Sequence, residues 1–234
     1  KDPLVMFRIF GPPGTGKTTT LLNMVDEALS SGVPPNKIAF LAFTRKAAHE
    51  AKERACERFK LDYQKDLYYF RTLHSLALTL SDIRSEQVLQ AENYKELSDK
   101  IGITLHVDKP SSDDLPDMLK AHDPILGLIN LARLRKVPLK EQYDLSSIEE
   151  PWVTVDYVAR SLKEYKEANG LFDFTDMLEN FVNEAHRYCP EFDLCFLDEA
   201  QDLSPLQWHI ADILEKKSKK MYCAGDDDQA IYKW

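Results

Sequence analysis

The stretch GPPGTGKT, residues 11–18, is the feature that most constrains the fold of this chain. It follows an apolar run over residues 5–10 and precedes a helical pattern from about Lys17 to Ser30. A loop with this glycine spacing turns its backbone N–H groups inward, towards phosphate, at the N-terminus of a helix. Buried strand, loop and helix in this order predict the phosphate-binding loop of a parallel α/β domain. A Gly/Pro-rich surface turn is the weaker alternative.

Two side chains of this loop have predicted roles beside a nucleoside triphosphate. Lys17 can reach the β- and γ-phosphates, and Thr18 can place its hydroxyl on Mg²⁺. Taken alone, the motif leaves open a kinase, a GTPase, a transporter ATPase or a motor protein. The residues predicted to bind the nucleotide here are Gly11, Pro12, Pro13, Gly14, Thr15, Gly16, Lys17, Thr18 and Thr19.

A second apolar run, FDLCFL, ends in the acidic pair Asp198 and Glu199. An ATPase of this design needs a carboxylate at a strand end to hold Mg²⁺ and a base to orient water. We therefore predict that Asp198 joins Thr18 as a metal ligand and that Glu199 polarises the attacking water. A solvated acidic loop is the alternative. A GTPase is disfavoured, because the sequence has no Asn-Lys-x-Asp segment that would read guanine.

The rest of the pattern predicts one α/β domain interrupted by helices. Further buried strands are expected at residues 37–43, 67–70, 192–197 and 219–225, with helices between them. Gly170 is expected to end one helix, and Ser204-Pro205 to begin another. The predicted parts are residues 1–84, the first part of the α/β domain; 85–150, a helical insertion; and 151–234, the second part.

Composition narrows the class of protein. With 44% hydrophobic and 29% charged residues, the chain is typical of globular proteins. It has neither an apolar run of about 18 residues nor a signal peptide, so no membrane partner is expected. Four cysteines without metal or redox spacing predict a reduced, cytoplasmic setting. The net charge of −9 argues mildly against a general nucleic-acid coat protein but allows a local basic groove.

Four more segments carry a resemblance to a known family: LAFTRKAAHEAKER, RTLHSLA, FDFTDML and AGDDDQAIYKW. With GPPGTGKT and LDEAQD, these motifs occur in the order seen in superfamily 1 DNA helicases of the UvrD/Rep/PcrA type. The chain resembles the N-terminal half of such an enzyme over nearly its whole length. Arg45 stands where the family usually has asparagine, and Leu73 where phenylalanine is common. The resemblance implies a RecA-like P-loop NTPase, with ATP and Mg²⁺, that couples hydrolysis to movement on single-stranded DNA.

The family pattern also implies roles for single residues. Gln229 would touch the γ-phosphate and its water, which makes the predicted catalytic set Lys17, Asp198, Glu199 and Gln229. Phe43 and Trp234 would stack on bases, each contact being worth about 1–3 kcal/mol. Core packing stays open for Phe43 and Tyr232, and a structural role for His74. The predicted nucleic-acid contacts are Phe43, Thr44, Thr72, His74, Tyr232 and Trp234; Asp173, Phe174 and Asp176 brace the site, approach the adenine side or pack in the core.

The expected partners are single-stranded DNA, or its junction with a duplex, and a second RecA-like domain of the same protein. The chain starts without methionine and stops at Trp234, where the family continues with W-R-G-A. We therefore expect it to be part of a longer product and to hydrolyse ATP weakly alone. The family travels 3′-to-5′. The alternatives are a superfamily 1 enzyme that acts on RNA or with a nuclease, and a non-motor ATP-binding module.

Overall fold

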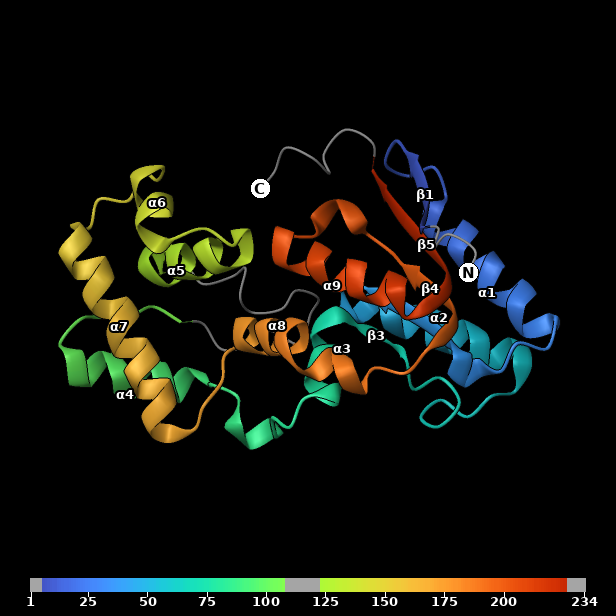
Figure 1. Cartoon of the computed structure of the whole chain (residues 1–234), viewed down its shortest axis with the longest axis horizontal. Coiled ribbons are helices and arrows are strands. Elements are labelled where there is room, and N and C mark those ends of the chain that lie inside the picture. Colours follow the sequence, from blue (N-terminus) through green and yellow to red (C-terminus); the bar gives the residue numbers. More distant parts are fainter. Residues whose placement is uncertain (1–5, 108–122, 227–234) are drawn as a thin grey trace.

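A parallel five-stranded sheet forms the centre of the larger part of the molecule (Figure 1). In the computed structural model, which describes residues 6–107 and 123–226, the strand order is β1-β5-β4-β2-β3. β4 and β5, from the second half of the chain, therefore lie between β1 on one side and β2 and β3 on the other, and both halves share one sheet. The strands are β1 (Met6–Gly11), β2 (Ile38–Ala42), β3 (Phe70–Thr72), β4 (Phe192–Leu197) and β5 (Ser218–Asp226).

Helices cover both faces of this sheet, which explains why its central strands are continuous apolar runs. Every residue of β2 is buried. Because successive side chains point to opposite faces, Phe40 packs in one hydrophobic cluster and Leu41 in another. The first cluster lies under α1 (Lys17–Ser30) and α2 (Arg45–Phe59). The second lies under α3 (Leu73–Leu80), α8 (Phe174–Asn183) and α9 (Pro205–Lys216).

Two strand predictions need correction. Residues 5–10 were expected to form a buried strand, but β1 is one of the two edge strands of the described sheet. It pairs with β5 alone and leaves Phe7 and Phe10 more than two-fifths exposed. The strand expected at 67–70 begins only at Phe70. Leu67 is fully buried although it precedes the strand, and its carbonyl accepts a turn hydrogen bond from Phe70 N at 3.1 Å. At Leu67 the apolar side chain indicated burial but not an extended backbone.

Both predicted helix boundaries are confirmed. Gly170 follows α7 (Trp152–Asn169) with a φ of 62°, in the left-handed region that favours glycine. Ser204 precedes α9, accepts a hydrogen bond from Gln207 N and donates its own N–H to the Gln207 side chain at 2.8 Å. This reciprocal capping box stabilises the start of α9.

A second, helical part lies beside the sheet (Figure 1) and has its own hydrophobic cluster. It contains α4 (Ala91–Ile101), α5 (Pro124–Arg135), α6 (Leu139–Asp144) and α7. The division expected after residue 150 remains a prediction; α7, which lies beyond it, gives Val155, Val158 and Leu162 to the same cluster as α4 and α5. Within the described ranges, no helix has the length and apolarity needed to cross a bilayer.

Candidate active site

The carboxyl ends of the strands meet at one edge of the sheet, where ligands bind in open parallel sheets. β1 ends at Gly11, opposite Asp226 at the end of β5. β4 ends at Leu197 beside β2, and Asp198 N donates to Leu41 O at 2.9 Å. The phosphate-binding loop and the acidic pair are therefore neighbours, although about 180 residues separate them in the chain.

The loop between β1 and α1 has the backbone geometry of an anion site. Gly14 and Gly16 have φ values of 78° and 77°, which residues with a Cβ adopt only at a cost. Gly16 immediately precedes α1, no side chain caps this helix, and its first turn has no acidic residue. Its N-terminal N–H groups are thus suited to phosphate. The other exposed loop residues are Pro12, Pro13 and Thr15, and Thr19 is exposed in the first turn of α1.

Lys17 bends back over the loop that precedes it. Its Nζ donates to Gly11 O and Pro12 O, each at 2.7 Å, and to Thr15 Oγ1 at 3.3 Å. The same atom forms an ion pair with Asp226 Oδ1 at 2.8 Å. The ammonium group therefore connects the loop directly to the end of β5.

Thr18 and Asp198 form the second link across this edge. Thr18 Oγ1 donates to Asp198 Oδ2 at 2.8 Å, and Asp198 Oδ1 accepts from Glu199 N at 2.9 Å. Burial raises the pKa of Asp198 above its ordinary value, and these hydrogen bonds offset only part of the effect. A nearby cation would stabilise the ionised carboxylate.

These donors fit Mg²⁺. Mg²⁺ usually takes one or two carboxylates and completes its shell with phosphate oxygens and water, whereas an all-protein cage is unusual. Among the described residues, no group of three His, Cys, Asp or Glu could hold a metal ion. The Thr18 hydroxyl and the Asp198 carboxylate, beside a phosphate loop, match the first pattern.

Glu199 has an unusual backbone. Its φ of 57° lies in the left-handed region, which costs a residue with a Cβ roughly 1–2 kcal/mol. The other two such residues in the described chain, Lys60 and Lys136, each end a helix, whereas Glu199 follows a strand. Burial raises the pKa of Glu199, with further contributions from Asp198 and Asp202. Strained backbone and a raised pKa suit a proton acceptor, although its role remains a prediction.

A cavity of about 570 Å³ lies close to this site and is lined by Phe43, Thr72 and His74. Phe174 and Met177 of α8 complete its aromatic and apolar wall, and basic side chains also line it: Arg45, Lys52 and Arg71. Aromatic rings for bases and cations for phosphates are the groups that hold a single strand. Phe43 is also buried in the core cluster, so its ring packs and lines the cavity at once.

His74 is buried, and its Nε2 has no hydrogen-bond partner. Burial lowers the pKa of His74 to about 4, so the ring is neutral near pH 7. A contact with a DNA phosphate would therefore be a hydrogen bond, not an ion pair. Its ring meets that of Phe174 edge-on, with centroids 6.1 Å apart.

Two threonines of the predicted nucleic-acid set cap helices at this edge. Thr44 Oγ1 accepts from Ala47 N at 3.2 Å, and Thr72 Oγ1 accepts from Ser75 N at 3.1 Å. Thr44 Oγ1 also donates to Glu199 Oε2 at 3.5 Å. Thr44 thus stands between the cavity and the acidic pair.

The sequence prediction assigned no role to Gln201 or to a contact of Asp226 with Lys17. Gln201 Oε1 accepts from Asp226 N at 3.3 Å, and a Cβ on Gly225 would lie 3.0 Å from Gln201 N. The glutamine therefore fixes the end of β5 against the turn after β4. Its signal was present in LDEAQD, where only the acidic pair was interpreted.

Lys17, Thr18, Asp198 and Glu199 are brought together, whereas Phe43, Thr72 and His74 surround the adjoining cavity. Gln229, Tyr232 and Trp234 lie outside the described residues, so their roles remain predictions.

Comparison with known proteins gives one family. Residues 5–234 match the family described as UvrD/REP helicase N-terminal domain. The "ATP-dependent DNA helicase PcrA" of Leuconostoc citreum is 27% identical, over 97% of this chain and 31% of that protein. The "Putative ATP-dependent DNA helicase YjcD" of Bacillus subtilis is 25% identical over 94% and 30%, and PcrA of Staphylococcus aureus Mu50 is 26% identical over 97% and 32%. The chain thus spans about a third of the length of these relatives.

Proposed function

The chain belongs to the UvrD/REP helicase family, and from that premise we propose that it is the ATP-binding part of an ATP-dependent DNA helicase. One observation carries this proposal. Segments distant in the sequence meet at the carboxyl ends of the strands, which we call the strand edge. They are joined there by the Thr18–Asp198 hydrogen bond and the Lys17–Asp226 ion pair. That edge has a phosphate cradle, a carboxylate suited to a cation and a carboxylate suited to a proton.

The side chains divide the work of hydrolysis. The loop N–H groups and Lys17 bind the β- and γ-phosphates of ATP. Thr18 and Asp198 would hold Mg²⁺, and the ion would supply positive charge to neutralise the charge that develops on the phosphates. Glu199 orients the attacking water and accepts its proton, because burial keeps the basicity of this carboxylate above the ordinary value. Gln229 contacts the γ-phosphate and its water.

The cavity beside α3 holds single-stranded DNA. A base stacks on Phe43, and basic side chains at the cavity contact phosphates. Tyr232 and Trp234, which lie outside the described residues, are the further proposed contacts with the DNA. Thr44 gives a short path between the bound DNA and ATP, because its hydroxyl both caps α2 and contacts Glu199. In the full protein, a second RecA-like domain closes over this edge, and hydrolysis drives movement in the 3′-to-5′ direction.

The test is Glu199→Gln in the full-length protein. Turnover should fall about 10²- to 10⁴-fold, the contribution of a general base, while binding of ATP is retained. Glu86→Gln is the matched control, because that side chain is exposed and belongs to a short helix that supplies no residue of the site. Undiminished turnover in Glu199→Gln would mean that another group activates the water.

Two further measurements address the substrate. Trp234→Ala should weaken binding of a single-stranded oligonucleotide and spare basal hydrolysis. Comparison of ATPase stimulation by DNA and by RNA of the same sequence separates the DNA helicase from the RNA alternative. Stimulation by neither would favour a non-motor ATP-binding module.

A further inference from the structure

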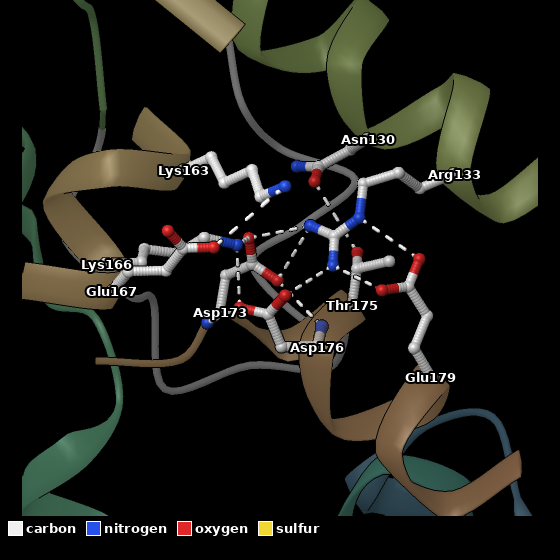
Figure 2. A network of polar contacts seen from close by, with 9 residues as sticks. All are labelled: Asn130, Arg133, Lys163, Lys166, Glu167, Asp173, Thr175, Asp176 and Glu179. Atoms are coloured by element: carbon white, nitrogen blue, oxygen red, sulfur yellow. Dashed lines mark hydrogen bonds and ion pairs between the residues drawn. The ribbon is translucent and has the colours of Figure 1, made fainter. Parts of the chain in front are cut away.

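A cluster of charged residues joins the helical part of the molecule to the first turn of α8 (Figure 2). We name it the Arg133 cluster. Arg133 comes from α5 and Lys166 from α7, whereas the carboxylates belong to the segment that begins α8. Its members are Arg133, Lys166, Asp173, Asp176 and Glu179.

Arg133 contacts all three carboxylates. Its Nη1 donates to Asp173 Oδ2 at 2.8 Å, and its Nη2 donates to Asp176 Oδ1 at 2.5 Å and Glu179 Oε2 at 2.8 Å. Lys166 Nζ bridges two of the same groups, lying 2.7 Å from Asp173 Oδ2 and from Asp176 Oδ2. A planar guanidinium with five N–H donors can form this fork, in which one side chain donates to three carboxylates. A lysine in its place would not reproduce it.

The cluster is largely removed from water. The side chains of Asp173, Lys166 and Arg133 are 7%, 11% and 22% exposed. Ion pairs buried to this extent contribute little net stability compared with apolar packing, but they demand one geometry. The cluster is therefore better suited to fixing a position than to adding stability.

The position that it fixes is the start of α8. Asp173 caps this helix by accepting from Asp176 N at 2.8 Å, and Asp176 Oδ2 accepts in return from Asp173 N at 2.8 Å. The capping box and the ion pairs use the same carboxylates. The carboxylates that contact α5 and α7 are therefore the same ones that cap the first turn of α8.

The next residue after Asp173 is Phe174, which lines the cavity assigned to single-stranded DNA. Its ring lies edge-on to His74 of α3, and Met177 lies one turn further along the same cavity wall. The path from Arg133 to the cavity is therefore short: one ion pair, one helix cap and one covalent neighbour.

We propose that Arg133 and Lys166 are positioning residues for the nucleic-acid cavity, through which the helical part of the molecule sets the position of Phe174. This inference rests on the proposed function, because the cavity must bind DNA for the position of its wall to matter. The helical part of the molecule then adjusts the affinity for single-stranded DNA without contacting ATP.

The experiment uses Arg133→Gln in the full-length protein, with a fluorescently labelled thymidine oligonucleotide and, separately, an ATP analogue. Affinity for the oligonucleotide should fall about tenfold, comparable to the loss of one stacked base. Affinity for the ATP analogue should stay within about twofold. Arg160→Gln is the matched control, because Arg160 lies on α7 and pairs with Asp156 on the exposed side.

Two more variants separate positioning from a general loss of fold. Arg133→Lys keeps the charge without the fork and should recover only part of the affinity for the oligonucleotide. Glu179→Gln leaves the helix cap intact and should lower that affinity about twofold to threefold, even where Arg133→Gln does not fold.

The outcomes are distinct. A folded Arg133→Gln protein with wild-type affinity for the oligonucleotide overturns the inference, as does an unchanged Glu179→Gln protein where Arg133→Gln does not fold. Equal losses of oligonucleotide and ATP-analogue binding also overturn it, because they indicate a structural role. Failure of the wild-type protein to bind the oligonucleotide refutes the proposed function, and this inference with it.

Discussion

Asp198 at the strand edge and Asp173 at the start of α8 are both almost fully buried, yet their pKa values move in opposite directions. Burial raises the pKa of Asp198, and its hydrogen bonds do not compensate. At Asp173 burial acts in the same direction, but Arg133 and Lys166 outweigh it and hold the pKa below the ordinary value.

The difference distinguishes a site suited to binding a metal ion from a cluster of charges that pair with one another. Around Asp173, cations of the protein lie within ion-pair distance of every carboxylate in the cluster. Around Asp198 and Glu199, hydroxyl and backbone groups supply the hydrogen bonds, and Lys17 forms its ion pair with Asp226 instead. The strand edge has an excess of negative charge that a metal ion would relieve, whereas the Arg133 cluster has charges committed to one another.

The largest expected effect comes from removing the cation of the strand edge. Lys17→Ala should lower ATP turnover at least about 100-fold, as expected for a group that stabilises charge developing on phosphate. Steady-state hydrolysis by the full-length protein measures it. Lys219→Ala is the control, because that lysine is exposed and pairs with Asp193. Normal turnover in Lys17→Ala would show that the loop is misassigned.

Exchanging each buried aspartate for asparagine sharpens the comparison. Asp173→Asn should lower the free energy of unfolding by roughly 3 kcal/mol, since it leaves partly buried cations underpaired. Asp198→Asn should leave it unchanged or slightly raised, because a poorly compensated charge is removed. Chemical denaturation without ligands measures both variants. Equal losses of stability would contradict the distinction between the two sites.

The pH dependence of stability should differ in sign. A depressed pKa means that Asp173 stabilises the fold above its unfolded-state pKa of about 3.9, and this contribution is lost as pH falls through the lower folded value. The pKa of Asp198 is raised in the folded protein. Stability therefore falls as pH rises from the unfolded-state pKa of about 3.9 to the higher folded value. Unfolding of the wild-type, Asp173→Asn and Asp198→Asn proteins over a pH series tests both signs. Parallel curves would contradict them.

The smallest effect concerns Asp226, whose carboxylate forms an ion pair with Lys17, the side chain that we propose to bind phosphate. Asp226→Asn should tighten ATP binding about threefold, by removing a negative charge from the phosphate loop and freeing the ammonium. Equilibrium titration with a fluorescent ATP analogue measures it. Weaker binding would indicate that Asp226 holds Lys17 in its productive position.

Sequence reasoning succeeded where one local pattern decides the outcome. The start of α1 at Lys17, the Gly170 terminus of α7 and the Ser204 capping box each depend on a few adjacent residues. The proximity of the loop to Asp198 was also predictable, because parallel strands place their carboxyl ends at one edge.

Other features depend on partners far apart in the chain. The exposure of Phe7 follows from the edge position of β1, which no local pattern specifies. No local pattern singles out Arg133, because its carboxylates lie about 40 residues later. The left-handed backbone of Glu199 likewise has no signal in the residue itself.

The position of β4 has a consequence for how the chain reaches its native state. None of the pairings in the described sheet joins β1 to β2 or β3, so residues 6–80 cannot assemble a continuous sheet when they first leave the ribosome. They depend on two strands, β4 and β5, which are made more than 100 residues later, and such non-local pairing is slow. The unpaired strand edges are exposed to aggregation and to chaperones until synthesis reaches β4 and β5.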